Sequence, residues 1–125
     1  TTLAVTGGIT TTSAIAITGA ITATGDITAF YSSDARLKTN VTNIDNALDK
    51  VSQINGVTFN WNDLAKDKDL TAREAGVIAQ EIQAVLPEVV TERDNGYLAV
   101  RYEKIIPLLI EAIKELKEEV ARLKK

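Results

Sequence analysis

The feature that most constrains this chain is a six-residue repeat that fills its first 33 positions. The pattern Thr-Gly-x-Ile-Thr begins at Thr6, Thr18 and Thr24, and a degenerate copy begins at Thr12. Two apolar or small series follow from it, and their members are Leu3, Ile9, Ile15, Ile21 and Ile27, and then Val5, Thr11, Ile17, Ala23 and Ala29. Because the second series lies two residues after the first, both share one face of an extended strand. The repeat predicts short β-strands that wind around an axis.

The repeat is too short to bury a core of its own. A single-chain β-helix of this period would complete fewer than two turns, and segments below about 40 residues usually need disulfides, a metal or association. The chain has no Cys and no His. We therefore expect a triple β-helix or β-prism built with identical chains, with Ile and Val inside and Thr outside. A flexible linker is the alternative, and the strict spacing of the Ile residues argues against it.

Charge divides the chain near residue 33. Residues 1–33 hold one charged side chain, Asp26, and every other charge lies after them. We predict two domains: the end of a fibrous β-repeat stalk over 1–33, and a module over 34–125 with a globular part at 34–102 and a C-terminal helix at 103–125. The chain begins at Thr1 without Met, so we expect a fragment, or the C-terminal end, of a longer protein.

Composition excludes several kinds of chemistry. The net charge is −3, with 14 Lys and Arg against 17 Asp and Glu, so we expect neither nucleic acid nor a membrane surface as a partner. Without Cys or His, disulfides, thiolate zinc sites and His-dependent catalysis are excluded, and we expect no metal and no cofactor. No apolar run approaches the roughly 20 residues that span a bilayer.

The start of the charged module has the pattern of a helix. Thr42 to Asp45 have the form of a capping box. The apolar positions between Ile44 and Ile54 then share one helical face, and Gly56 follows them. These signals predict a helix that is capped locally and closed by Gly56.

The next segments alternate between strand and helix signals, which is typical of an α+β fold. Apolar and polar residues alternate over 57–61, which predicts a half-buried strand, and a charged loop follows at 66–69. Residues 75–79 predict a buried strand or helix entry that leads into a helix ended by Pro87. The Asp-Asn-Gly triplet at 94–96 predicts the turn of a hairpin.

The C-terminal helix carries an assembly signal. Six apolar residues follow 3,4 spacing, with β-branched residues at a and Leu at d, and we call them the heptad seam: Ile106, Leu109, Ile113, Leu116, Val120 and Leu123. This choice of residues by itself favours two strands. An amphipathic helix packed on its own domain is the alternative, because confident seams need three or four heptads. Apolar residues almost surround the first half, including Ile105, Leu108, Ile110 and Ala112, so we expect that half to be buried.

One chemical candidate lies at the junction of the two domains. Without His, a serine can be activated by a neutral lysine, and Ser33 and Lys38 form such a pair. Desolvation, or a nearby cation such as Arg36, would lower the pKa of this lysine from about 10.4. The spacing is unfavourable, since residues i and i+5 point about 140° apart on a helix and to opposite faces of a strand. A local turn or outside packing must join them; otherwise both are ordinary junction residues.

Five ordered blocks together resemble one known family. The blocks are residues 33–38, 44–48 with 56–61, 74–83 with 86–90, 96–102, and 107–116. They are similar to the C-terminal intramolecular chaperone domain of bacteriophage tailspikes and tail fibres, as in endosialidase tailspikes. The resemblance covers the chain from Ser33 to about Lys117, and a fibrous β repeat upstream is what it leads one to expect.

The resemblance implies an assembly and a reaction. It implies a homotrimer whose C-terminal domains form a helical bundle first and then nucleate the upstream fibre of the same polypeptide. We follow this trimer over the dimer that the seam favours, because a short seam beside a buried flank constrains oligomer state weakly. It also implies self-cleavage at Ser33–Asp34, with Ser33 as the essential serine and Lys38 as its partner. The location implied is the virion tail, after assembly in the host cytoplasm and release of the chaperone part.

Three points stay open. A hydroxyl that attacks the carbonyl of its own residue closes a four-membered ring, so an N-to-O shift at Ser32–Ser33 competes with cleavage at Ser33–Asp34. If the Ser33–Lys38 geometry exists only in the trimer, premature cleavage is avoided. The competing functions are a trimerisation tip that does not cleave and a hexapeptide-repeat acyltransferase, for which this chain lacks both turns and a His.

Overall fold

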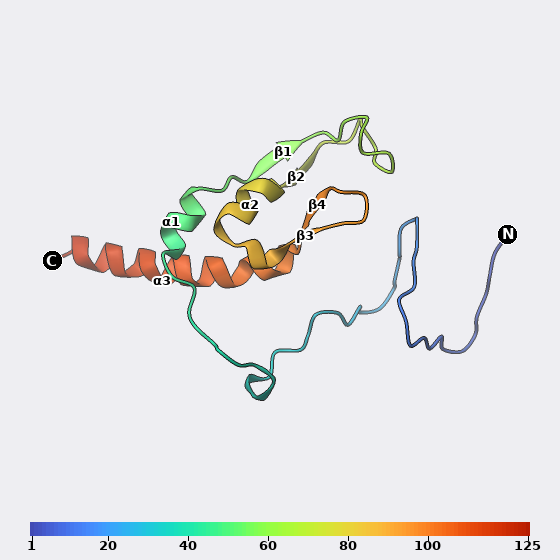
Figure 1. Ribbon diagram of the computed structural model, residues 1–125, viewed down its shortest axis with the longest axis horizontal. Coiled ribbons are helices and arrows are strands. Elements are labelled where there is room, and N and C mark those ends of the chain that lie inside the picture. The colour runs from blue at the N-terminus through green and yellow to red at the C-terminus, as the bar shows by residue number, and fades with distance from the viewer. The chain divides into compact units, whose positions relative to one another are not determined.

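The computed structural model describes all 125 residues. The chain divides into two units, Thr1–Thr39 and Asn40–Lys125 (Figure 1). None of its helices combines the length and the apolar character that a bilayer-spanning segment requires.

The repeat in the first unit forms neither helix nor strand in the single chain. Its repeated isoleucines stay open to solvent; Ile15 and Ile21, for instance, are 62% and 69% exposed. A lone copy of the repeat therefore buries none of its apolar face, and the β-fibre stays a prediction that needs further copies of the chain. The one regular element of this unit is a 3₁₀ turn at Ala35–Leu37 (η1).

The second unit is a small α+β domain with a long C-terminal helix, which confirms that part of the predicted fold. Its elements in order are α1 (Ala47–Ser52), β1 (Val57–Phe59), β2 (Glu74–Gly76), α2 (Ala79–Val85), the 3₁₀ turn η2 (Pro87–Val89), β3 (Val90–Glu92), β4 (Leu98–Val100), the 3₁₀ turn η3 (Tyr102–Ile105) and α3 (Ile106–Leu123). The strands form two separate antiparallel pairs, β1 with β2 and β3 with β4.

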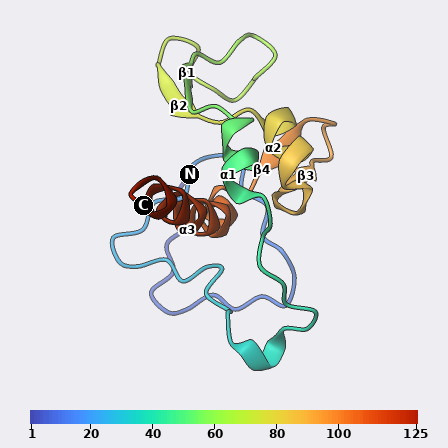
Figure 2. The same cartoon turned by 90° about the vertical axis from the view of Figure 1, so that its left-hand side faces the viewer.

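One apolar core holds this unit together. It contains eight buried residues: Ala47, Ile82, Val85, Leu86, Val89, Ile105, Leu108 and Ala112. Ile82 of α2 and Leu108 of α3 are the largest side chains with no exposure. Both views place α1 and α2 on the same side of α3, and Figure 2 looks nearly along α3. The core therefore fixes one face of α3 against the rest of the unit.

The strand and turn signals of the sequence correspond to elements of this unit. β1 lies within the alternating segment 57–61, and α2 ends just before Pro87, as predicted. β3 and β4 form the predicted hairpin, in which Gly96 has a φ of 86° and its N–H donates to the Arg93 carbonyl at 2.8 Å. A positive φ is the conformation that favours glycine at such a turn.

The predicted capping box is wrong. α1 begins only at Ala47, after Asn46, which has a left-handed backbone and makes no side-chain cap. Instead, Glu115 of α3 accepts the N–H of Ala47 at 2.7 Å and the N–H of Leu48 at 3.1 Å. A carboxylate satisfies free N–H groups at a helix start and interacts well with its dipole. The cap therefore comes from tertiary packing and not from the local sequence.

Candidate functional site

A short turn near the end of the first unit folds the chain back on itself. The Leu37 N–H donates to the Asp34 carbonyl at 3.0 Å, and the Lys38 N–H donates to the Ala35 carbonyl at 3.2 Å. These two consecutive i to i+3 bonds make up the η1 turn, with Asp34 as its N-cap. Residues 33 and 38 lie at the two ends of this turn, so its geometry decides whether their side chains can meet.

The side chains of Ser33 and Lys38 do meet. Lys38 Nζ donates a hydrogen bond to Ser33 Oγ at 2.9 Å, across a sequence separation of five. A local turn is one of the two routes that the spacing left open, and it is the route observed. The contact forms within one chain, so the idea that this geometry exists only in the trimer is wrong. Both residues are exposed in the single chain.

Asp34 and Arg36 are joined across the same turn. The Asp34 carboxylate accepts from the Arg36 N–H at 2.8 Å, from Arg36 Nε at 3.1 Å and from Arg36 Nη2 at 2.9 Å. The side-chain bonds from Arg36, and then its backbone N–H, lower the pKa of Asp34 below its ordinary value. The guanidinium that the sequence offered as a neighbouring cation for Lys38 is thus paired with Asp34.

The role of Asp34 in the turn was missed from the sequence. Asp is among the residues preferred at N-caps, because its side chain accepts an N–H two or three residues later. An Asp directly after Ser33 was therefore a usable signal for a turn at this point. The resemblance, by contrast, implies a role for Asp34 only as half of the expected scissile bond.

The heptad seam lies along the side of α3 that its own domain leaves uncovered. The exposed fractions of its residues are 56% for Ile106, 42% for Leu109, 66% for Ile113, 49% for Leu116, 44% for Val120 and 82% for Leu123. The apolar residues that α3 does bury are Leu108 and Ala112. The alternative, in which α3 packs this apolar stripe on its own domain, is therefore not what the single chain forms. Ile110 was expected to be buried and is instead exposed.

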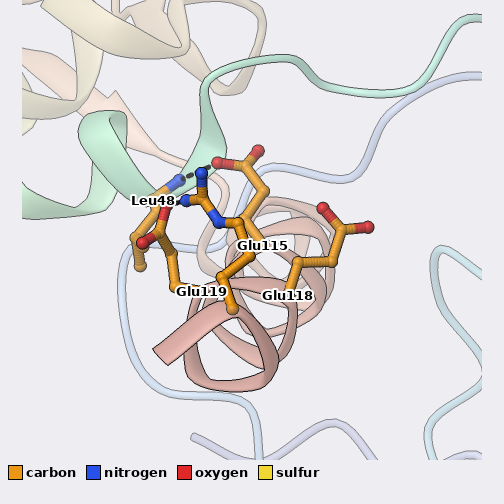
Figure 3. Close-up of a pocket in the computed structure, with 5 residues that line it drawn as sticks. Leu48, Glu115, Glu118 and Glu119 are labelled. Atoms are coloured by element: carbon orange, nitrogen blue, oxygen red, sulfur yellow. Dashed lines mark hydrogen bonds and ion pairs between the residues drawn. The ribbon is translucent and has the colours of Figure 1, made fainter. Parts of the chain in front are cut away.

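The opposite side of α3 is anchored by polar contacts to the start of the domain. Glu111 accepts from Asn43 Nδ2 at 3.1 Å, in addition to the cap that Glu115 gives α1. Figure 3 shows the hollow that forms there, lined by Leu48, Glu115, Glu118, Glu119 and Arg122. Glu119 is paired with Arg122. This hollow holds no nucleophile, and no group of His, Cys, Asp or Glu residues in the chain is arranged to hold a metal.

Comparisons with known proteins relate the chain to phage tail fibres. Residues 33–91 match the model of a peptidase family described as "Chaperone of endosialidase". Long tail fiber protein Gp37 of Enterobacteria phage K3 is 41% identical over 98 residues, which are 75% of this chain and 8% of that protein. The proteins of the same name from Enterobacteria phage M1 and Salmonella phage S16 are each 35% identical over 99 residues. The chain spans 39% of the M1 protein and 13% of the S16 protein, so it corresponds to a minor part of each relative.

Proposed function

Residues 33–91 belong to the endosialidase chaperone family, and on this premise we propose that the chain is the C-terminal chaperone of a phage tail fibre, which trimerises, guides folding of the upstream fibre and then cleaves itself. The observation that carries the cleavage is the 2.9 Å hydrogen bond from Lys38 Nζ to Ser33 Oγ. It lies between the repeat, whose one charged side chain is Asp26, and the charged module, where a cut separates the two.

In this proposal, association through α3 gives the repeat the partner strands that a single chain lacks. Strands that pair between chains gain nothing until the association entropy has been met, which makes such structures slow to form. The exposed heptad seam supports association of α3 with further copies of the chain. Once three chains are joined, each repeat meets its partners at an effective concentration of roughly millimolar. The repeat can then bury its isoleucines in the fibre.

The proposed reaction uses Lys38 as the base and Ser33 as the nucleophile. A neutral Lys38 amine takes the hydroxyl proton, and Ser33 Oγ attacks the carbonyl carbon of Ser33 in a neighbouring copy. The C–N bond to Asp34 breaks, and the departing amine receives the proton from Lys38. Water then hydrolyses the ester that remains, which restores the serine hydroxyl and completes the cut at Ser33–Asp34.

An intrachain route competes with this one. Lys38 takes the hydroxyl proton, Ser33 Oγ attacks the Ser32 carbonyl carbon of its own chain, and the C–N bond between the two residues breaks. The departing Ser33 nitrogen receives the proton from Lys38, which leaves an ester and a free Ser33 amine. Hydrolysis of that ester cuts at Ser32–Ser33. The two routes yield N-terminal fragments that differ in mass by one serine residue.

In this proposal, burial in the trimer desolvates Lys38, which is the condition for cleavage that the single chain does not meet. A lysine acts as a base near neutral pH when it is desolvated or placed beside another cation. In the single chain Lys38 is exposed, and the nearby guanidinium of Arg36 is paired with Asp34. Assembly would therefore switch the site on by excluding water, since the contact between the two side chains already exists. Cleavage after assembly cuts the fibre from its chaperone and leaves the fibre kinetically trapped.

Intact mass spectrometry of the purified chain and its variants tests this function. The wild type and Ser32→Ala should each yield two fragments, whereas Ser33→Ala and Lys38→Arg should each stay at full length. Lys38→Arg keeps the positive charge but cannot supply a neutral base. A single full-length species for all four proteins, with the trimer present, would identify a trimerisation tip that does not cleave.

A further inference from the structure

The spacing of Ser33 and Lys38 in the sequence does not by itself bring their side chains together. Residues five apart diverge on a helix and on a strand, yet Lys38 Nζ lies 2.9 Å from Ser33 Oγ. The intervening residues make only two backbone hydrogen bonds, both of the 3₁₀ type. Isolated turns of this kind are weak, because each bond fixes several backbone dihedrals. Something else must hold the turn.

We propose that Asp34 and Arg36 are positioning residues for self-cleavage, because the Asp34 carboxylate caps the turn and the Arg36 fork holds that carboxylate in place. This inference rests on the proposed function of the Ser33–Lys38 pair. The Asp34 nitrogen is half of the scissile bond, but the Asp34 and Arg36 side chains hydrogen-bond to each other and to neither Ser33 Oγ nor Lys38 Nζ. They act by setting the backbone that carries both reacting side chains.

The contacts of Asp34 fit this role. Its Oδ1 accepts from the Arg36 backbone N–H, which is the N-cap bond of the turn, and also from Arg36 Nε. Its Oδ2 accepts from Arg36 Nη2. Both carboxylate oxygens are therefore bound, and a planar guanidinium is the group that suits such a two-pronged contact. The pair ties the side chain of residue 36 to that of residue 34, across the first bend of the turn.

The exposure of the pair argues that it serves the site and not the fold. The Arg36 and Asp34 side chains are 89% and 45% exposed, and exposed ion pairs contribute little to global stability. The buried core is made only of residues between Ala47 and Ala112. Removing the pair should therefore leave folding and assembly intact while it loosens the turn.

Cleavage rates of four variants test the proposal in trimeric protein. Asp34→Ala removes every contact of the carboxylate and should slow cleavage about 100-fold, the scale expected when a reacting group is misplaced by about 1 Å. Asp34→Asn keeps an oxygen for the cap and should recover about tenfold of that loss. Arg36→Met removes the fork without touching the scissile bond, and it should slow cleavage about tenfold, whereas Arg36→Lys should behave like Arg36→Met because a lysine cannot make the two-pronged contact.

A matched control is available at a second exposed pair. Lys50 Nζ lies 3.0 Å from Asp45 Oδ1, and the Asp45 side chain is 83% exposed. Asp45→Ala removes a comparable carboxylate outside the turn and should leave the cleavage rate unchanged. The trimer content of every variant, measured by sedimentation, should equal that of the wild type.

Two readouts separate positioning from other roles. Arg36→Met should cleave more slowly than the wild type at every pH, and the midpoint of its pH–rate profile should equal that of the wild type. A different midpoint would mean that Arg36 acts on the protonation of the site and not on its geometry, and would overturn the proposal. Wild-type cleavage rates for Asp34→Ala and Arg36→Met would overturn it too. A loss in Asp34→Ala alone would assign the effect to the leaving residue and would equally count against it.

A structural measurement keeps this inference apart from the proposed function. In the uncut Ser33→Ala chain, nuclear Overhauser effects between Asp34 and Leu37 and between Ala35 and Lys38 report the turn directly. Adding Asp34→Ala or Arg36→Met should abolish them. If they persist, the pair does not hold the turn and the inference fails. If they vanish while the wild type never cleaves, the pair holds the turn and only the proposed function fails.

Discussion

At the scale of single residues, the absence of a side chain at Gly76 makes room for a hydrogen bond between Val77 and Tyr102 in the second unit. The Val77 N–H donates to the Tyr102 hydroxyl oxygen at 3.1 Å, which links the end of β2 to the turn before α3. A Cβ added at Gly76 would lie 2.5 Å from that oxygen and 3.3 Å from a ring carbon of Phe59. The tyrosine reaches the backbone only because position 76 carries no side chain.

We therefore expect Gly76→Ala to destabilise the second unit by about 0.5–1.5 kcal/mol, since the Tyr102 hydroxyl must withdraw from its exposed hydrogen bond to the Val77 N–H. Urea unfolding measures the change. Gly56→Ala is the matched control, because nothing lies within 4 Å of a Cβ at that position. In a Tyr102→Phe background the cost of Gly76→Ala should shrink, and an unchanged cost would show that the hydroxyl is not what the methyl group meets.

The charge of Asp34 predicts an acid limit for the η1 turn. Arg36 lowers the pKa of Asp34 in the folded turn, so the turn gains from the ionised carboxylate at any pH above the unfolded value of about 3.9. That gain is lost as pH falls and the carboxylate becomes protonated through the lowered pKa. The amide resonance of Arg36 should therefore titrate below pH 3.9 in the Ser33→Ala chain. In Arg36→Met the same transition should move to higher pH; no movement would mean that the ion pair is absent in solution.

At the scale of elements, α3 divides its apolar residues between two tasks. Neighbouring leucines belong to different faces: Leu108 has no exposure, and Leu109 is 42% exposed. Leu108 packs in the core with Ile82 and Ala112. Leu109 belongs to the heptad seam. One face of α3 thus packs in the core, and another apolar face stays exposed in the single chain.

This division makes opposite predictions for two adjacent substitutions. Leu108→Ala should destabilise the second unit by about 2–5 kcal/mol, because it leaves a cavity in a closed core. Leu109→Ala should change the unfolding of the dissociated chain little, and it should instead weaken self-association. Urea unfolding at low concentration and sedimentation across a concentration series measure the two effects. Equal effects of both variants on unfolding, with no change in association, would contradict the assignment of faces.

The elements that could be predicted from the sequence are mostly those whose determining residues lie within the element itself. Pro87 and Gly96 act on their own turns, so the end of α2 and the β3–β4 hairpin were predictable. The cap of α1 was not, because its acceptor is Glu115, 68 residues along the chain from Ala47. Ser33 and Lys38 were identified from residue type and resemblance, whereas the turn that joins them was missed although its signal, the N-cap Asp34, is local.

At the scale of the whole molecule, the proposed function links association through α3 to cleavage at the Ser33–Lys38 pair, which lies far from α3 in the sequence. The repeat of a single chain is exposed, the heptad seam is exposed, and the Ser33–Lys38 contact is already formed. The chain therefore holds the parts for cleavage before assembly, but it lacks the burial that would desolvate them. In the proposed function, control of cleavage therefore comes from association, and not from rearrangement of the pair.

A charge in the heptad seam tests that link. Ile113→Glu places a carboxylate at a central seam position, where a trimer would have to bury three of them, and such burial is strongly unfavourable. We expect the variant to remain monomeric and to cleave at least about tenfold more slowly than the wild type, as measured by sedimentation and by intact mass over time. Ala121→Glu adds the same charge to an exposed position of α3 outside the seam, and it should trimerise and cleave normally.

Restoring association by other means completes the test. A trimeric coiled coil fused after Lys125 of the Ile113→Glu chain should bring back both the trimer and most of the cleavage rate, because it supplies proximity without changing Ser33 or Lys38. If monomeric Ile113→Glu cleaves at the wild-type rate, the exposed pair is active without burial and association does not control it. If the fused trimer stays uncut while the wild type cleaves, the native packing of α3 is itself required, and proximity of the three chains is insufficient to exclude water from the site.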